Sequence, residues 1–115
     1  FLIWGNGEQN RSFIYVTDVV EGLLLVADKG INKGPIQLGT NEKTTINQIA
    51  EMTMEVSGKD IVKEHDLTKP VGDFGRAADI TLAKEILGWE PTVSMKDGIK
   101  KTYDWAEKFL KTHEL

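Results

Sequence analysis

Two arginines are the residues of this 115-residue chain best suited to bind an anion. Arg11 follows the glycine-rich stretch "WGNGEQN", and Arg76 lies between Gly75 and two alanines in "VGDFGRAAD". A guanidinium can bind a phosphate through two parallel hydrogen bonds. Charge-assisted hydrogen bonds contribute roughly 1.5 to 3 kcal/mol each, so two arginines on long loops could clamp a diphosphate and raise its affinity about 10² to 10⁴-fold. The alternative for Arg11 is a solvated surface arginine.

The glycines of "WGNGEQNRSF" do not match a dinucleotide-binding loop. That loop needs G-x-G-x-x-G between a strand and a helix, because the helix N-terminus faces the pyrophosphate. Asn10 stands at the third glycine position, and the strand-like "SFIYV" follows where the helix would be needed. We therefore expect Gly5 and Gly7 to be turn residues, and no cofactor site in this chain.

The remaining reactive residue types do not form a catalytic or metal-binding pattern. The chain has no cysteine, which excludes a disulfide framework, a thiolate metal site and a cysteine nucleophile. Asp66, Asp73 and Asp79 lack a recognisable ligand spacing. His65 lies in an alternating strand-like run and His113 near the C-terminal end, which favours structural or solvated roles. We predict neither a catalytic residue nor a metal site.

Composition predicts one small globular domain over residues 1–115, since 40% of the residues are hydrophobic. A net charge of −4 argues against a nucleic-acid partner. No apolar run approaches the roughly 20 residues that cross a bilayer, so we expect no membrane partner and a soluble, cytoplasmic protein. The apolar, strand-like start "FLIW" without an initiator Met indicates a cut end rather than a signal peptide.

The first arginine is expected between two strands and ahead of a helix. Apolar runs at 1–4 and 12–16 predict the strands. In "TDVVEGLLLVADKG", Thr17 is the expected N-cap and Gly30 the C-terminal stop. The helical spacing predicts a buried face formed by Val20, Leu23, Leu24 and Ala27.

A strand, helix and strand are expected next. "GPIQLGT", residues 34–40, predicts a short strand. "TINQ" is a capping box with Thr45 as cap, which predicts a helix over 46–57. The alternating "IVKEHDL", residues 61–67, predicts another strand, so 35–67 should form a right-handed parallel crossover.

The second arginine is expected on a loop that leads into the last two helices. Residues 68–79 have no hydrophobic period, and Asp79 should cap a helix over 80–87. Trp89 is expected to pack that helix onto the core. Ser94 with Asp97 predicts the start of a final helix, whose apolar stripe consists of Met95, Ile99, Tyr103, Ala106 and Leu110.

Three ordered motifs resemble one known family. "WGNGEQNRSFIYVTDVVEGL", "IQLGTNEKTTINQIAEM" and "VGDFGRAADITLAKEILGWEPTVSMKDGIKKTYDW" are together similar to the C-terminal third of the NAD-dependent sugar-nucleotide epimerases and dehydratases, in the extended short-chain dehydrogenase/reductase family. The resemblance implies a small α/β substrate-binding segment with short strands and about four helices, from which the Rossmann domain is missing.

The resemblance also implies roles for individual residues. Arg11 and Arg76 would bind the diphosphate of a nucleoside-diphosphate sugar, and Gln9 would line its nucleotide side. The spacing in "GDFGRAAD" resembles the GDP-mannose 3,5-epimerase branch. The chain departs from the family pattern at Ser12, where Asp is frequent, and at Gln37, where Asn is usual. Both departures concern contacts near the ribose or base.

The chemistry that the resemblance implies belongs to the complete enzyme. Such enzymes bind NAD or NADP through an N-terminal Rossmann domain and transiently oxidise the sugar with a Tyr-x-x-x-Lys set. Tyr15 is followed four residues on by Val19, and Tyr103 by Glu107, so this chain lacks that set and should be inactive alone. The complete enzyme is expected to be a homodimer. The alternative is a free-standing, non-catalytic nucleotide-sugar-binding or interaction module.

Overall fold

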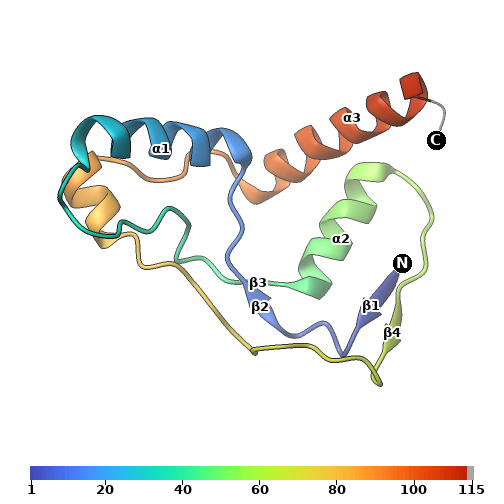
Figure 1. Ribbon diagram of the computed structural model, residues 1–115. Helices are drawn as coiled ribbons and strands as arrows, with labels where there is room; N and C mark the ends of the chain where they lie inside the picture. The colour runs from blue at the N-terminus through green and yellow to red at the C-terminus, as the bar shows by residue number, and fades with distance from the viewer. Residues whose placement is uncertain (114–115) are drawn as a thin grey trace.

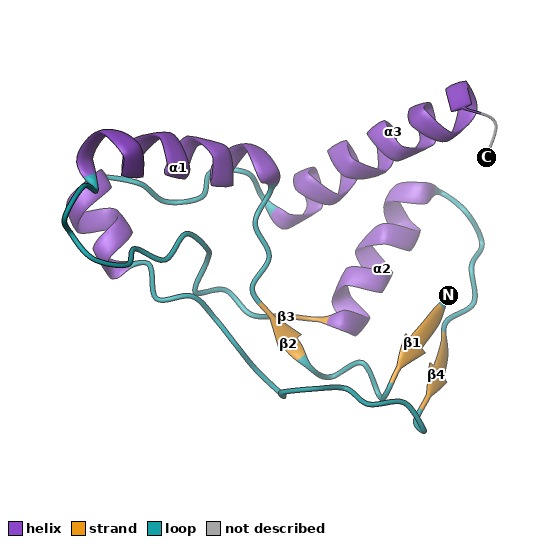
Figure 2. Ribbon diagram, in the orientation of Figure 1, coloured by secondary structure: helices purple, strands orange, loops and turns teal. Residues whose placement is uncertain are grey.

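The computed structural model describes residues 1–113, without the side chain of His113. Figure 1 shows two groups of elements, α1 with η1 at one end and α2 with α3 at the other, joined by extended segments. Short strands lie below α2, and loops make up much of the chain (Figure 2). The elements are β1 (Leu2–Trp4), β2 (Asn10–Arg11), α1 (Val16–Lys29), β3 (Thr44–Thr45), α2 (Ile46–Ser57), β4 (Glu64–Asp66), the π-helix η1 (Ala83–Leu87) and α3 (Met95–His113).

The strands form two small sheets. β1 pairs with β4 in parallel, and β2 pairs with β3 in antiparallel register. The predicted strand over 12–16 is wrong, because the extended pairing stops at Arg11 and α1 begins at Val16. Ser12 instead fixes this segment through its side chain, since its Oγ donates to the Thr40 carbonyl at 2.6 Å.

The predicted parallel crossover over 35–67 is also wrong. Residues 34–40 form no strand, and β4 pairs with β1. A strand needs a neighbour that accepts and donates its backbone hydrogen bonds. Here the 34–40 segment contacts a loop instead of a strand. Ala78 donates its backbone N–H to the Thr40 carbonyl, and Asp79 donates its backbone N–H to Oε1 of Gln37.

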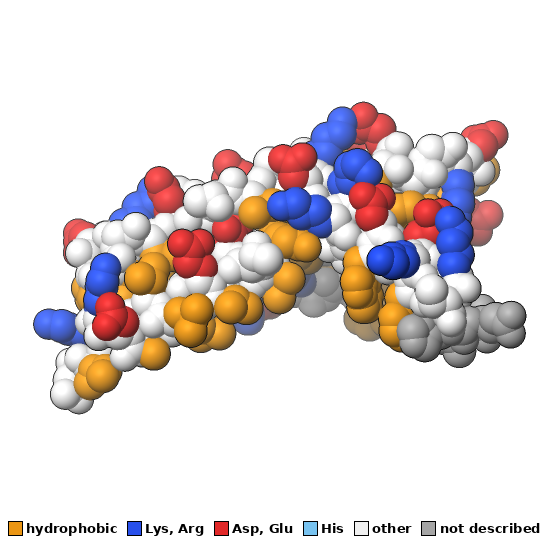
Figure 3. All heavy atoms as spheres, turned by 90° about the horizontal axis from the view of Figure 1, so that it is seen from above, with side chains coloured by type: hydrophobic (Ala, Val, Ile, Leu, Met, Phe, Trp, Pro, Cys, Tyr) orange, Lys and Arg blue, Asp and Glu red, His pale blue; other side chains and the backbone are white. Residues whose placement is uncertain are grey.

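Helix α1 forms as predicted but buries a different face. The predicted face is largely exposed, with 51% of Val20, 56% of Leu23 and 68% of Leu24 accessible. Asp18 and Gly22 are buried instead. Gly22 packs closely against Leu38, since a Cβ at Gly22 would lie 2.8 Å from a Leu38 methyl group. The helix is apolar on several sides, so its period did not select the inward face. Figure 3 shows hydrophobic side chains gathered in patches among charged ones on the upper surface.

The start of α1 also differs from the prediction. Thr17 lies inside the helix, and Tyr15 is the N-cap residue without a side-chain capping hydrogen bond. Gly30 ends the helix as predicted. The carbonyl of Tyr15 accepts the backbone N–H of Asp18 at 3.1 Å, so the first turn is closed by backbone bonds.

Helix α2 has the predicted bounds and begins with the predicted capping box. The Thr45 hydroxyl accepts the Gln48 backbone N–H at 3.0 Å, and the Gln48 side chain accepts the Thr45 N–H at 2.8 Å. Gly58 ends the helix in the left-handed region with φ of 63°, where a residue without a Cβ is unstrained.

The predicted helix over 80–87 forms, but most of it is a π-helix. Ala83 and Leu87 are buried with Ile80 and Trp89, and these four residues form the core. Trp89 is only 3% exposed, as predicted. Partly buried residues that pack against this core include Leu25 and Val26 of α1 and Ile36 and Leu38 of the following segment.

The Asp79 carboxylate accepts hydrogen bonds from Thr81 at the start of this helix, although the N-cap residue of η1 itself is Leu82. The titration of Asp79 should be measurable. The Thr81 hydroxyl and then the Thr81 backbone N–H donate to its carboxylate, which lowers the pKa of Asp79 below the ordinary value of 3.8. A carboxylate whose pKa is lower in the folded chain than in the unfolded chain stabilises the fold at every pH above its unfolded pKa. This contribution is lost as the pH falls through its folded pKa. We expect Asp79→Asn to lose less stability than wild type from about pH 5 to about pH 2, measured as urea midpoints. Parallel loss in both proteins would contradict this role.

Helix α3 begins at its predicted capping box and packs against α2. The Ser94 Oγ accepts the backbone N–H of Asp97 at 3.2 Å and donates to its carboxylate at 2.6 Å. Most of the predicted stripe is partly buried, but Leu110 is 50% exposed. None of the helices in residues 1–113 combines the length and apolar character needed to span a membrane.

Candidate functional site

Arg11 fastens β2 to the loop that carries Arg76. Its Nη1 donates to the Asp73 carbonyl at 2.6 Å and to the Asn10 carbonyl at 2.7 Å, and its Nη2 reaches the Val71 carbonyl at 3.5 Å. The backbone N–H of Asn10 also donates to the Phe74 carbonyl at 2.9 Å. The loop therefore runs beside β2, and Arg11 is not a freely solvated arginine.

Arg76 lies on the same loop and is largely exposed. Its guanidinium forms an ion pair with the Asp73 carboxylate, with 78% of the Arg76 side chain and 60% of the Asp73 side chain accessible. Asp73 thus contacts Arg11 through its backbone and Arg76 through its side chain. These are the two arginines of the sequence, and the fold brings both to one residue.

Gln9 occupies a different environment from the arginines. It is 7% exposed, and its Nε2 donates to the Trp4 carbonyl at 3.1 Å. Its Oε1 is the one buried side-chain oxygen or nitrogen of the described residues that has no hydrogen-bond partner. The backbone carbonyl of Gln9 accepts the N–H of Ile46 at 3.3 Å, which ties the residue before β2 to the start of α2.

The two guanidinium groups retain the capacity to bind an anion. A guanidinium has five N–H donors, and backbone carbonyls engage three of those of Arg11. Its Nε and one hydrogen of Nη2 remain for a ligand. The exposed ion pair of Arg76 is worth little in water, so an anion can replace it at small cost. Because arginine stays protonated, this arrangement can bind and orient a ligand but supplies no proton.

The two departures from the family pattern have structural partners. The Ser12 Oγ donates to the Thr40 carbonyl and accepts the Thr40 N–H, so it joins the segment after β2 to the end of the 34–40 segment. The Gln37 Oε1 accepts the Asp79 backbone N–H at 2.9 Å. Both contacts hold the ends of the segments that carry the arginines.

Asp18 is a structurally important residue that the sequence did not indicate. It is 2% exposed, and its carboxylate accepts the N–H and hydroxyl of Thr92 and the N–H of Val93. Its carbonyl accepts the indole N–H of Trp89 at 3.1 Å. The available signal was an acidic residue in the first turn of a helix. These bonds fix α1, and with it the segment that leads back to Arg11, against residues 89–93.

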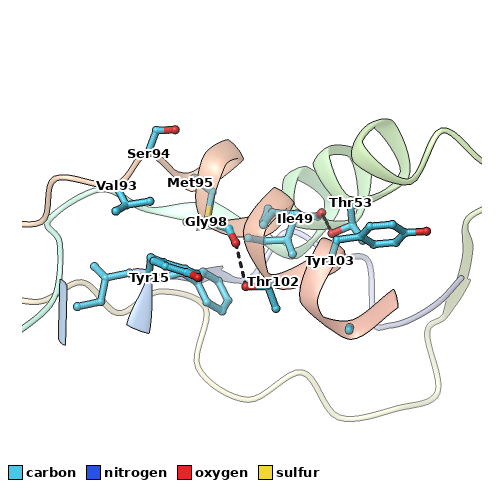
Figure 4. A pocket seen from close by; sticks show the side chains of 13 residues that line it. Tyr15, Ile49, Thr53, Val93, Ser94, Met95, Gly98, Thr102 and Tyr103 are labelled. Atoms are coloured by element: carbon cyan, nitrogen blue, oxygen red, sulfur yellow. Dashed lines mark hydrogen bonds between the residues drawn. The ribbon is translucent and has the colours of Figure 1, made fainter. Parts of the chain in front are cut away.

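A separate cavity of about 400 Å³ lies between residues 13–15, α2 and α3. Figure 4 shows Tyr15 and Tyr103 on its wall with the side chains of both helices. The Thr53 and Thr102 hydroxyls donate to the carbonyls of Ile49 and Gly98 on their own helices. The cavity is therefore lined mainly by apolar groups, and neither arginine is among its lining residues.

Comparisons with known proteins identify a consistent set of relatives. The family model described as GDP-mannose 4,6 dehydratase matches residues 1–102. GDP-mannose 3,5-epimerase 1 of Oryza sativa subsp. indica is 36% identical over 108 residues, which is 94% of this chain and 28% of that protein. UDP-glucuronic acid decarboxylase 6 of Arabidopsis thaliana is 39% identical over 93 residues, 81% of this chain and 27% of that protein.

Solved structures that this chain resembles include sugar-nucleotide epimerases. UDP-glucose 4-epimerase of Thermotoga maritima, solved with UDP-glucose, has a TM-score of 0.85 and 39% identity, covering 95% of this chain and 35% of that one. UDP-glucuronic acid 4-epimerase of Bacillus cereus, solved with NAD, has a TM-score of 0.79 and 33% identity, covering 94% and 34%. The chain thus spans about a third or less of the proteins that it matches.

Proposed function

Since the chain belongs to the GDP-mannose 4,6 dehydratase family of NAD-dependent sugar-nucleotide epimerases and dehydratases, we propose that it is the nucleotide-sugar-binding C-terminal part of such an enzyme. In this proposal the complete enzyme transiently oxidises the sugar of a nucleoside-diphosphate sugar with NAD or NADP. The chain supplies the anchoring of the substrate and none of the redox chemistry.

The observation that carries this proposal is the meeting of both arginines at Asp73. A diphosphate offers two adjacent groups of oxygen acceptors, and guanidinium groups bind such oxygens in pairs. The unengaged N–H groups of Arg11 and the exposed guanidinium of Arg76 can take one phosphate group each. We propose these two residues as the diphosphate-binding groups.

Gln9 completes the proposed site on the nucleotide side. Its Nε2 is held by the Trp4 carbonyl, so the amide has a fixed orientation. Its Oε1 is buried and without a partner among the described residues, and a buried acceptor is stabilised by any N–H that reaches it. We propose that Gln9 and the backbone beside it line the nucleotide side of the site.

The remaining parts of the proposed enzyme lie outside this chain. We propose that a Rossmann domain binds the cofactor, carries the Tyr-x-x-x-Lys set and covers the exposed apolar residues of α1, Val16, Val20, Leu23 and Leu24. Exposed apolar surface of this kind commonly marks a contact with another domain. The complete enzyme is proposed to act as a cytoplasmic homodimer.

Replacing Arg76 by alanine in the complete enzyme tests the substrate-binding role. Loss of its charge-assisted hydrogen bonds should weaken nucleotide-sugar binding about 10- to 100-fold, while NAD binding stays unchanged. Isothermal titration calorimetry with UDP, GDP and their sugar conjugates measures the first affinity, and titration with NAD measures the second. Lys108→Ala removes an exposed positive charge from α3 and serves as the matched control.

Two results would count against this proposal. Equal loss of nucleotide-sugar and NAD affinity in Arg76→Ala would indicate general damage, and loss of neither would remove Arg76 from the site. Nucleotide-sugar binding by the isolated 115 residues as tight as by the complete enzyme would favour a free-standing binding module, since a pocket shared between two domains cannot form in one of them.

A further inference from the structure

Asp73 has two contacts that use different atoms. Its backbone carbonyl accepts Nη1 of Arg11 at 2.6 Å, whereas its carboxylate pairs with Arg76. The preceding Gly72 has φ of 68°, and a Cβ there would lie 3.4 Å from Nη2 of Arg11. The backbone of the loop is therefore held by Arg11 independently of the Asp73 side chain.

The carboxylate of Asp73 pairs with the Arg76 guanidinium, which is also a proposed binding group for the diphosphate. Its pair with Arg76 is exposed at both ends, so water screens the attraction. A diphosphate carries more negative charge and more acceptor oxygens than one carboxylate, so it forms the stronger pair with the same guanidinium. Two anions cannot share this guanidinium closely without repulsion.

We propose that Asp73 is an internal competitor that binds Arg76 before the substrate does and is displaced by the diphosphate of the substrate. This inference rests on the proposed function of Arg76. On binding, the carboxylate moves to solvent while the Asp73 carbonyl stays on Arg11. Asp73 is therefore a positioning residue that holds the Arg76 guanidinium against the loop and lowers the affinity for the diphosphate.

Asp73→Asn separates these two contacts. The asparagine keeps the backbone carbonyl for Arg11 and nearly the same shape, but it removes the competing negative charge. Exposed ion pairs contribute about 0.2 to 1 kcal/mol, so we expect UDP and inorganic pyrophosphate to bind about 1.4- to fivefold more tightly. The gain should shrink at high salt, because salt screens exposed charges.

The experiment is calorimetric titration of the complete enzyme with UDP and with inorganic pyrophosphate at low and high salt. The variants are Asp73→Asn, Arg76→Ala and the double variant, with Asp28→Asn on α1 as a control for the same change in net charge. Asp73→Asn should bind both ligands more tightly than wild type. The same substitution should give no gain in the Arg76→Ala background, and Asp28→Asn should give none either.

The outcomes separate this inference from the proposed function. Arg76→Ala binding as wild type overturns both. Weakened binding in Arg76→Ala, combined with no tightening in Asp73→Asn, overturns only the competition. Equal tightening by Asp73→Asn with and without Arg76, or by Asp28→Asn, shows a general charge effect and also overturns it.

Discussion

Replacing Asp18 by alanine should lower the free energy of unfolding of this chain by about 2 to 4 kcal/mol. The carboxylate is 2% exposed and accepts three hydrogen bonds from Thr92 and Val93. Its removal leaves two part-buried backbone N–H groups and the Thr92 hydroxyl without their charged acceptor, and a hydrogen bond to a charged group contributes about 1.5 to 3 kcal/mol. Urea unfolding followed by tryptophan fluorescence measures the loss.

Two further variants make the Asp18 experiment specific. Asp28→Ala removes an exposed carboxylate from the same helix and should change the unfolding free energy by less than about 0.5 kcal/mol. Asp18→Asn should be intermediate, because its oxygen can still accept from Thr92 while its amide meets the Val93 N–H. An Asp18→Ala variant as stable as Asp28→Ala would show that the network does not stabilise the fold.

Replacing Arg11 by alanine should have the largest effect on substrate binding. The variant loses one diphosphate-binding group and also the bonds that fasten the 70–79 loop to β2. We expect nucleotide-diphosphate affinity in the proposed complete enzyme to fall at least about 100-fold, which exceeds the loss expected for Arg76→Ala. Calorimetry with UDP and GDP measures the affinity.

The effect of Arg11 on the loop can be measured separately from binding. Tryptic cleavage after Arg76 should be about tenfold faster in Arg11→Ala, because a loop with fewer hydrogen bonds opens more often. Arg11→Lys keeps the charge but lacks the planar guanidinium that reaches several carbonyls. Its cleavage rate should therefore lie between those of the wild type and Arg11→Ala. Unchanged cleavage in Arg11→Ala would show that the carbonyl contacts do not hold the loop.

Several elements could be predicted because their signals lie within a few residues. The capping boxes at Thr45 and Ser94 predicted where α2 and α3 begin. Gly58 and Gly88 end their helices in the left-handed region, which glycine adopts without strain. The ordered motifs similarly predicted the family that the comparisons identified.

Strand pairing could not be predicted from the same local signals. The runs at 12–16 and 34–40 have strand-like composition, yet neither forms a strand here, while β1 pairs with β4 about 60 residues away. β-propensity describes fitness for a pleated surface and does not choose the neighbour. The neighbour is set by which segments meet in three dimensions.

The site shows the same division between sequence and tertiary structure. The sequence by itself determined the two arginines, the glycine-rich turns beside them and the helices with their own caps, because these depend on residue type and on hydrogen bonds between near neighbours. Only the tertiary structure decided that both arginines meet at Asp73, that Gln9 is buried and that Asp18 joins α1 to residues 89–93. These contacts connect residues far apart in the chain, so they exist only once packing has brought their partners together.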